Sequence, residues 1–229
     1  MIRTIVWMMV CGLAAALSPP LWAAPVADRD MLSAIKSMES PAEDMFDAIA
    51  GKDMQQLNRL FDALAASMAT LNRSRTDLSD EQERNIAMLN SWFDIVALEM
   101  QEMDDFPALA SAINQFTAQM IISMPAEHAY EKNVAWMDYL GRELLLLNQY
   151  PSDSSNRTAL QRARKRDLQA NWLEISAMMN TTPQGAQLVA KADPVIHGLM
   201  AESSAVKMMV LARSELEWVD QIEHYFHMD

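Results

Sequence analysis

Methionine is the residue type that most suggests a chemical role for this sequence, since the chain contains 20 methionines. Thioether sulfur is a soft ligand that selects Cu(I). Met120, Met124 and His128 follow one another at four-residue spacing, although Pro125 interrupts that stretch. The pattern suggests a copper site. Methionine also fills gaps in helical cores, and we favour core packing as the interpretation.

A second candidate metal site lies near the last residue of the sequence. His224 and His227 are three residues apart, so a helix would place both imidazoles on one face. Two imidazoles one turn apart can bind zinc, copper or nickel. The alternative, which we favour, is a solvated helix end with no bound metal.

Positive charge is concentrated between residues 157 and 166, although the chain's formal net charge is −13. The cluster consists of Arg157, Arg162, Arg164, Lys165 and Arg166. On a helix, several of these side chains share a face that could dock an acidic protein partner or anionic lipid headgroups. The alternative, which we favour, is pairing with the chain's own acids, for example Asp94, Glu99, Glu102, Asp104 and Asp105.

Common catalytic and cofactor-binding patterns do not occur in the sequence. It contains no Gly-x-Ser-x-Gly, no phosphate loop and no His-Glu-x-x-His. The Glu-x-x-His pattern of di-iron bundles and the Cys-x-x-Cys-His pattern of covalent haem are also missing. We therefore expect a protein that is not an enzyme and has no cofactor, with copper as the alternative.

The first 24 residues resemble a secretory signal peptide. Arg3 precedes an apolar run of about a dozen residues, too short to span a bilayer, and small residues follow near Ala23. We expect cleavage there and a periplasmic or secreted protein. Cys11 is the only cysteine, so the mature chain would contain no disulfide. No later segment is apolar enough to span a membrane, and the acidic charge argues against a nucleic acid partner.

Apolar residues recur every three or four positions through most of the remaining chain, which is typical of amphipathic helices. One such stripe contains Met54, Leu57, Phe61, Leu64, Met68 and Leu71. The pattern predicts an all-α fold, an antiparallel helical bundle, within one domain at 25–229. The predicted helices span 28–39, 41–50, 52–73, 79–104, 107–123, 127–149, 156–180, 183–192 and 194–228, with a break near 198–203.

Capping residues support these helix boundaries. Ser79 with Gln82 forms a predicted capping box, and Ser40–Pro41, Thr182–Pro183 and Asp193–Pro194 are predicted helix starts. We expect the tryptophans on the apolar stripes to be largely buried anchors, namely Trp92, Trp136, Trp172 and Trp218.

A weak internal duplication is also visible. Pro-Ala-Glu occurs at 41–43 and 125–127, and Trp92 and Trp172 begin similar four-residue segments. The separations vary, so the match requires gaps. It suggests two pseudo-repeated halves, 41–123 and 125–200, followed by a C-terminal helix at 202–228. The alternative is that helical bundles reuse similar caps and stripes.

Three classes of function remain. We favour a non-catalytic exported protein that binds a protein partner in the cell envelope, as an adaptor, chaperone or accessory subunit. The alternatives are a periplasmic copper-binding bundle and a solute-binding bundle with a pocket between its helices. The sequence does not define the oligomeric state.

Overall fold

The computed structural model describes residues 26–75, 78–102, 105–124, 129–150, 154–226 and 228. Within these ranges the chain forms eight α-helices and no strand, which confirms the predicted all-α bundle. The helices are α1 (Val26–Gly51), α2 (Met54–Arg73), α3 (Asp80–Glu102), α4 (Phe106–Ser123), α5 (Ala129–Gln149), α6 (Ser154–Met179), α7 (Pro183–Ala201) and α8 (Ala205–Phe226). None of these helices is long and apolar enough to cross a membrane.

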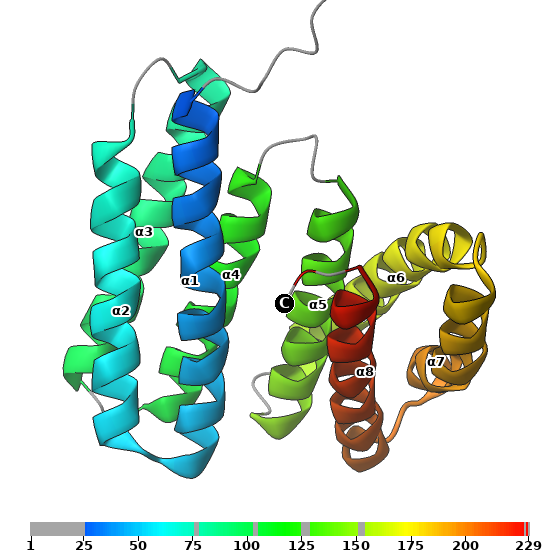
Figure 1. Ribbon diagram of the computed structural model, residues 1–229. Coiled ribbons are helices and arrows are strands. Elements are labelled where there is room, and N and C mark those ends of the chain that lie inside the picture. The colour runs from blue at the N-terminus through cyan, green and yellow to red at the C-terminus, as the bar shows by residue number, and fades with distance from the viewer. Residues whose placement is uncertain are drawn as a thin grey trace, which may run out of the picture.

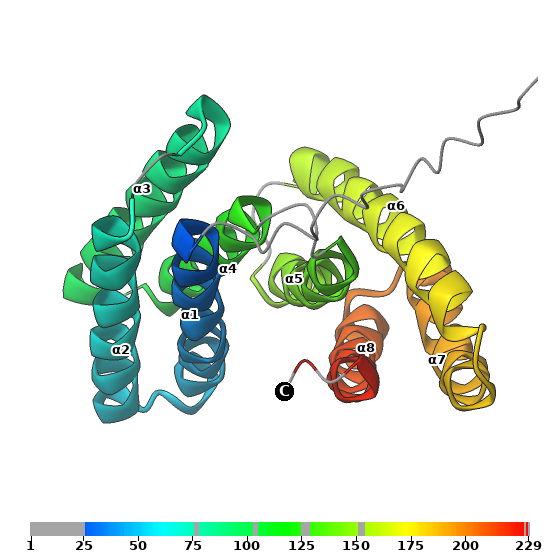
Figure 2. The ribbon, with the colours of Figure 1, turned by 45° about the horizontal axis from the view of Figure 1, so that its top comes forward.

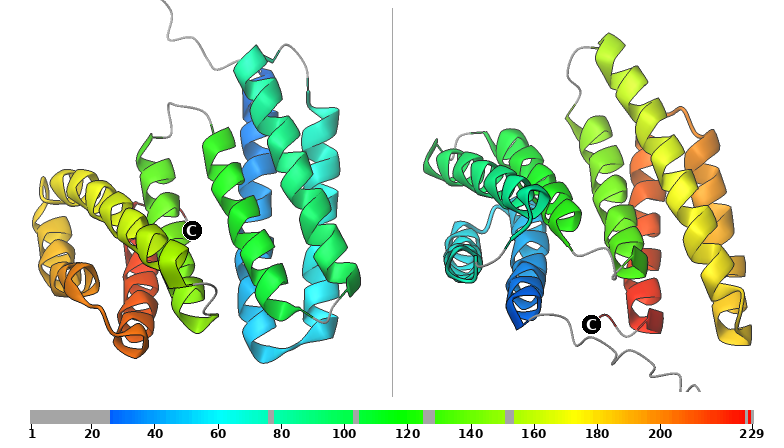
Figure 3. Two further views of the ribbon diagram at one scale, coloured as in Figure 1. Left: turned by 180° about the vertical axis from the view of Figure 1, so that it is seen from behind. Right: turned by 90° about the horizontal axis from the view of Figure 1, so that it is seen from above.

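The helices form two groups of four. α1 packs on α2 and α4, and α3 packs on α4, whereas α5 packs on α6 and α8, and α7 packs on both α6 and α8. Figures 1 and 2 show α1–α4 on one side of the molecule and α5–α8 on the other. We call these groups the first half and the second half. The main helix packing between them is that of α4 against α5, which lie at the junction when the molecule is viewed from behind (Figure 3).

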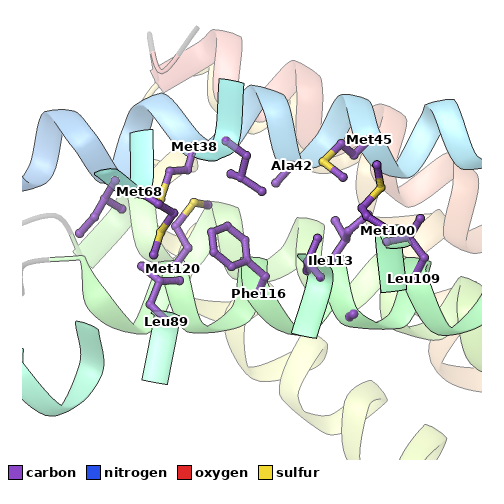
Figure 4. Packing of buried hydrophobic residues seen from close by; sticks show 14 of the residues in the cluster. Met38, Ala42, Met45, Met68, Leu89, Met100, Leu109, Ile113, Phe116 and Met120 are labelled. Atoms are coloured by element: carbon purple, nitrogen blue, oxygen red, sulfur yellow. The ribbon is translucent and has the colours of Figure 1, made fainter. Parts of the chain in front are cut away.

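Each half has its own apolar core. The first core is rich in methionine, and Met38, Met68 and Met120 approach one another from three helices beside Phe116 (Figure 4). The second core is built on residues such as Trp172. A buried leucine of α5 joins the first core and two buried residues of α4 join the second, so the two cores interlock at the α4–α5 junction. The predicted pseudo-repeat stays a prediction.

The prediction that a helix starts at Ser40–Pro41 is wrong, because α1 continues through Pro41. Proline lacks an N–H group, which leaves the Ser37 carbonyl without its helical donor. The Ser67 hydroxyl of α2 donates a hydrogen bond to that carbonyl at 3.3 Å. The apolar stripe of α1 also runs unbroken past the proline, from Met38 to Met45, so continued burial favours one helix.

Pro194 also lies inside a helix, α7, and does not begin one as predicted. Asp193 accepts a hydrogen bond from the Trp172 indole at 2.7 Å instead of capping a helix. The predicted break after Gly198 is confirmed, because α7 ends at Ala201.

The other two predicted caps are confirmed. The Ser79 amide donates to the Gln82 side chain, and the Gln82 amide donates to the Ser79 hydroxyl, as a capping box requires. The Thr182 hydroxyl accepts a hydrogen bond from the Gly185 amide at the start of α7.

The tryptophan prediction is confirmed in part. Trp172 is buried, whereas Trp92, Trp136 and Trp218 are half-buried. A large indole at the margin of a helix stripe can bury one edge in the core while its other edge meets solvent.

Candidate functional site

The predicted methionine ligands lie inside the first core. Met120 is fully buried and Met124 is 5% exposed. Figure 4 shows Met120 among core side chains of α1, α2 and α3. His128 lies outside the described residues. These positions support packing as the role of both methionines, and the copper site stays a prediction.

The predicted histidine pair is described only in part. His224 is exposed on α8, where it lines a shallow pocket of about 260 Å³ with Leu188 and Tyr225. His227 lies outside the described residues. Among the residues with assigned positions, no group of three or more His, Cys, Asp or Glu side chains is placed to hold a metal ion.

The predicted basic cluster divides into inward and outward side chains. Arg164 faces α5, where its guanidinium lies 3.7 Å from the Glu143 carboxylate and 5.5 Å from the centre of the Tyr139 ring. It also lies 3.6 Å from Asp167 on its own helix. Arg164 therefore joins α6 to α5 and is not available as a docking residue.

Lys165 also has a structural role. Its ammonium donates hydrogen bonds to the carbonyls of Met200 and Glu202, at 3.4 and 2.5 Å. These carbonyls lie at the C-terminal end of α7, where helix carbonyls lack helical donors and favour a cation. The five acids suggested by the sequence include none of the observed partners of Arg164 or Lys165.

Arg162 and Arg166 point outward. Both are exposed, and neither forms an ion pair or hydrogen bond with another residue that the structure describes. Ala170 and Leu173 continue the same helical face, and Leu173 is 62% exposed. We call these four residues the α6 face. Arg157, at the start of α6, is half-buried.

A cluster of acidic side chains between the two halves was not predicted from the sequence. Glu39 and Glu43 of α1 and Glu223 of α8 line a cavity of about 270 Å³. Beside it, the Arg142 guanidinium of α5 lies 2.8 Å from Asp138 and 3.4 Å from Glu43. Arg142 therefore joins a helix of the first half to a helix of the second.

Burial and mutual repulsion make these carboxyl groups hard to ionise. Burial, reinforced by Glu43, raises the pKa of Glu39 to about 7, and burial together with Asp138 raises the pKa of Glu43 to about 7. Burial raises the pKa of Asp138 to about 6, against the opposing effect of Arg142. Burial and the nearby acids raise the pKa of Glu223 to about 8.

Glu215 is the most deeply buried member of this acidic group. It is 0% exposed, and its carboxyl oxygens have no hydrogen-bond partner among the described residues. Burial raises the pKa of Glu215 well above its usual value. Its carboxyl group packs against Gly141 of α5, where any added Cβ atom would overlap it. The glycine therefore makes the space that this acid occupies.

The residue spacing in α8 indicates that Glu215 is buried. The buried residues of α8 are Met208, Ala212, Glu215, Val219 and Ile222, which alternate between four- and three-residue spacing. The acid thus occupies a core position in a helical stripe. Val206, an apolar residue of the same helix, is instead 67% exposed, so residue type alone does not identify the buried face of α8.

A groove with a volume of about 460 Å³ lies on another side of the junction. Ile122, Lys132 and Trp136 contribute to its wall, together with asparagines of α3, α5 and α6. The Lys132 ammonium donates to the Met124 carbonyl at 2.9 Å, which stabilises the end of α4. The groove combines an aromatic surface with amide groups.

Comparison with family models, curated proteins and solved structures finds no match for this chain.

Proposed function

We propose that this is an exported, non-catalytic helical protein that binds a protein partner in the cell envelope through the α6 face. Two features support the proposal: the signal-like N-terminal sequence and the absence of known catalytic patterns from the sequence. The α6 face supplies the candidate contact surface.

The observation that carries the proposal is the different use of neighbouring cations on α6. Arg164 and Lys165 bind groups of their own chain, whereas Arg162 and Arg166 face outward beside an exposed leucine. Arginine beside an apolar side chain is a common composition at protein interfaces. An acidic surface with an apolar pocket would complement this face.

Site-specific photo-crosslinking tests this contact in intact cells. A photoreactive residue replaces Ala170 within the α6 face, and a second variant carries it at Leu98, which is 52% exposed on α3. We expect a discrete crosslinked protein from position 170 and none of the same mass from position 98. The captured protein is identified by mass spectrometry, and we expect acidic residues at its contact site.

Charge reversal tests whether the contact needs the two arginines, and a second double variant is the matched control. Arg162→Glu with Arg166→Glu should reduce crosslinking from position 170 at least tenfold, because each guanidinium then becomes a repelling carboxylate. Arg59→Glu with Arg84→Glu changes the net charge equally on exposed positions of α2 and α3 and should leave crosslinking intact. Equal crosslinking by both double variants would exclude the α6 face as the docking surface.

Export is tested separately by intact mass measurement after cell fractionation. We expect the chain in the periplasm or medium, with an N-terminus close to Ala24. A full-length chain found only in the cytoplasm would contradict export without bearing on the α6 face.

The groove at Trp136 supports a second candidate, the binding of a small solute. Its volume is within the usual range for ligand sites, and it combines an aromatic side chain with polar groups. A metabolite that raises the melting temperature of the wild type, but not of Trp136→Ala, would support this function. The absence of a shift across a broad metabolite panel would count against it.

A further inference from the structure

The two halves are joined by chemically different contacts on two sides. On one side α4 packs against α5, and α4 contains no titratable side chain between Phe106 and Ser123. Ala118 and Ile121 of α4 enter the second core, and Leu146 of α5 enters the first. These apolar contacts carry no charge, and the Glu143 carboxylate of α5 beside them accepts hydrogen bonds from Asn114 and Gln115 of α4 and lies 3.7 Å from Arg164.

The other side is the acidic joint, which we define by the charged groups that face one another from α1, α5 and α8. They are Lys36, Glu39, Glu43, Asp47, Glu131, Asp138, Arg142, Glu215, Asp220 and Glu223. Lys36 lies 2.5 Å from Glu131, and Arg142 contacts Glu43 and Asp138, so both cations bridge α1 and α5. The half-buried Phe46 of α1 lies beside Arg142 and packs against both cores, which makes it an apolar contact on this side.

The acidic joint contains more negative groups than its cations can neutralise. Eight of its ten members are acids, and only Lys36 and Arg142 are basic. On one side of the joint α1 packs against α2 and α4, and on the other α8 packs against α5 and α7. Between α1 and α8 lie side chains and the 270 Å³ cavity. Ionisation of every acid would therefore drive α1 and α8 apart.

We propose that the acidic joint is a proton-operated hinge, which holds the two halves together when Glu39, Glu43 and Glu223 are protonated and lets them separate when these groups ionise. The α4–α5 contact is the pivot. Each half keeps its own core in both states, because all buried members of the first core except Leu146, and all of the second except Ala118 and Ile121, come from one half.

The raised pKa values set the direction and the pH range. A carboxyl group whose pKa is higher in the closed protein than in the open one stabilises the closed form at low pH. That stabilisation is lost as pH rises through the closed-state pKa, which is about 7 for Glu39 and Glu43 and about 8 for Glu223. The hinge therefore closes toward pH 5 and opens toward pH 9.

A distance measurement across the molecule tests the hinge in the full chain. α2 and α7 lie on opposite flanks of the two halves (Figure 1). Spin labels at Asn58→Cys and Gln187→Cys, both exposed positions, report the separation of the flanks after Cys11→Ser removes the only native thiol. We expect a narrow distance distribution at pH 5 and a longer, broader one at pH 9. Identical wild-type distributions at the two pH values would overturn the proposal.

Isosteric amides identify the responsible groups. Glu39→Gln with Glu43→Gln and Glu223→Gln imitates the protonated joint, so this variant should keep the narrow distribution at pH 9. The control variant, Glu83→Gln with Glu102→Gln and Glu217→Gln, removes three exposed acids outside the joint and should open as the wild type does. A joint variant that still opens, or a control variant that no longer does, would show that the joint does not operate the movement.

Discussion

Gly141 is the residue whose replacement most directly tests the packing of α8 on α5. The Cβ atom of alanine would overlap the Glu215 carboxyl group and would also lie 2.8 Å from a methyl carbon of Leu216. We expect Gly141→Ala to lower the free energy of unfolding by about 2 kcal/mol, as overpacking does in other cores. Urea denaturation measures the loss.

Gly198→Ala is the matched control for that substitution. Its Cβ atom would meet Leu211 at 3.5 Å, an ordinary van der Waals distance, within helix α7. Alanine is the better helix former, so we expect no loss and a gain of up to about 1 kcal/mol. A similar loss at both glycines would mean that the Glu215 contact is not the cause.

Lys165 and Arg166 are adjacent in sequence but should respond differently to removal of their charge. Lys165→Met removes the hydrogen bonds to the end of α7 and should cost about 1 kcal/mol of stability. Arg166→Met changes an exposed side chain and should stay within about 0.5 kcal/mol of the wild type. Thermal denaturation distinguishes the two variants, and equal losses would contradict the division of the basic cluster.

The start of α7 is stabilised by a side-chain cap and by a contact with α8. The Thr182 hydroxyl accepts the Gly185 amide and lies 2.7 Å from the Tyr225 hydroxyl of α8. Thr182→Ala removes both interactions and should cost about 1 kcal/mol, whereas Thr182→Ser keeps the hydroxyl and should cost less than half as much. Amide hydrogen exchange over residues 184–187 should increase in the alanine variant alone. Equal exchange in the two variants would exclude the cap as the stabilising contact.

Two prolines show that tertiary packing determines where a helix begins when the local sequence allows more than one outcome. Ser40–Pro41 and Asp193–Pro194 both have the composition of a helix start, yet both prolines lie inside helices. Thr182–Pro183 has the same composition and does begin a helix. The difference is that apolar stripes run through Pro41 and Pro194 without a break, so burial of both flanking segments outweighs the lost backbone hydrogen bond.

For the whole molecule, stability should decrease as pH rises from 5 to 9. The acids of the joint have raised pKa values in the folded protein, so the folded chain binds more protons than the unfolded chain above about pH 4.5. We expect the free energy of unfolding to be about 3 kcal/mol lower at pH 9 than at pH 5, allowing for solvent screening in the open cavity. The variant with Gln at positions 39, 43 and 223 should lose much less free energy of unfolding over the same pH range. A rise in wild-type stability over this range would contradict the assignment.

The sequence by itself determined the helical class, most helix boundaries and two of the caps, because helix periodicity and capping depend on residues close together in the chain. It did not determine the acidic joint, since Glu43, Arg142 and Glu223 come from three helices far apart in sequence. Nor did it separate Arg164 from Arg166, because their roles depend on whether α5 or solvent lies opposite each side chain. Only the packing of the two halves decides which charges are buried, and burial is what changes their chemistry.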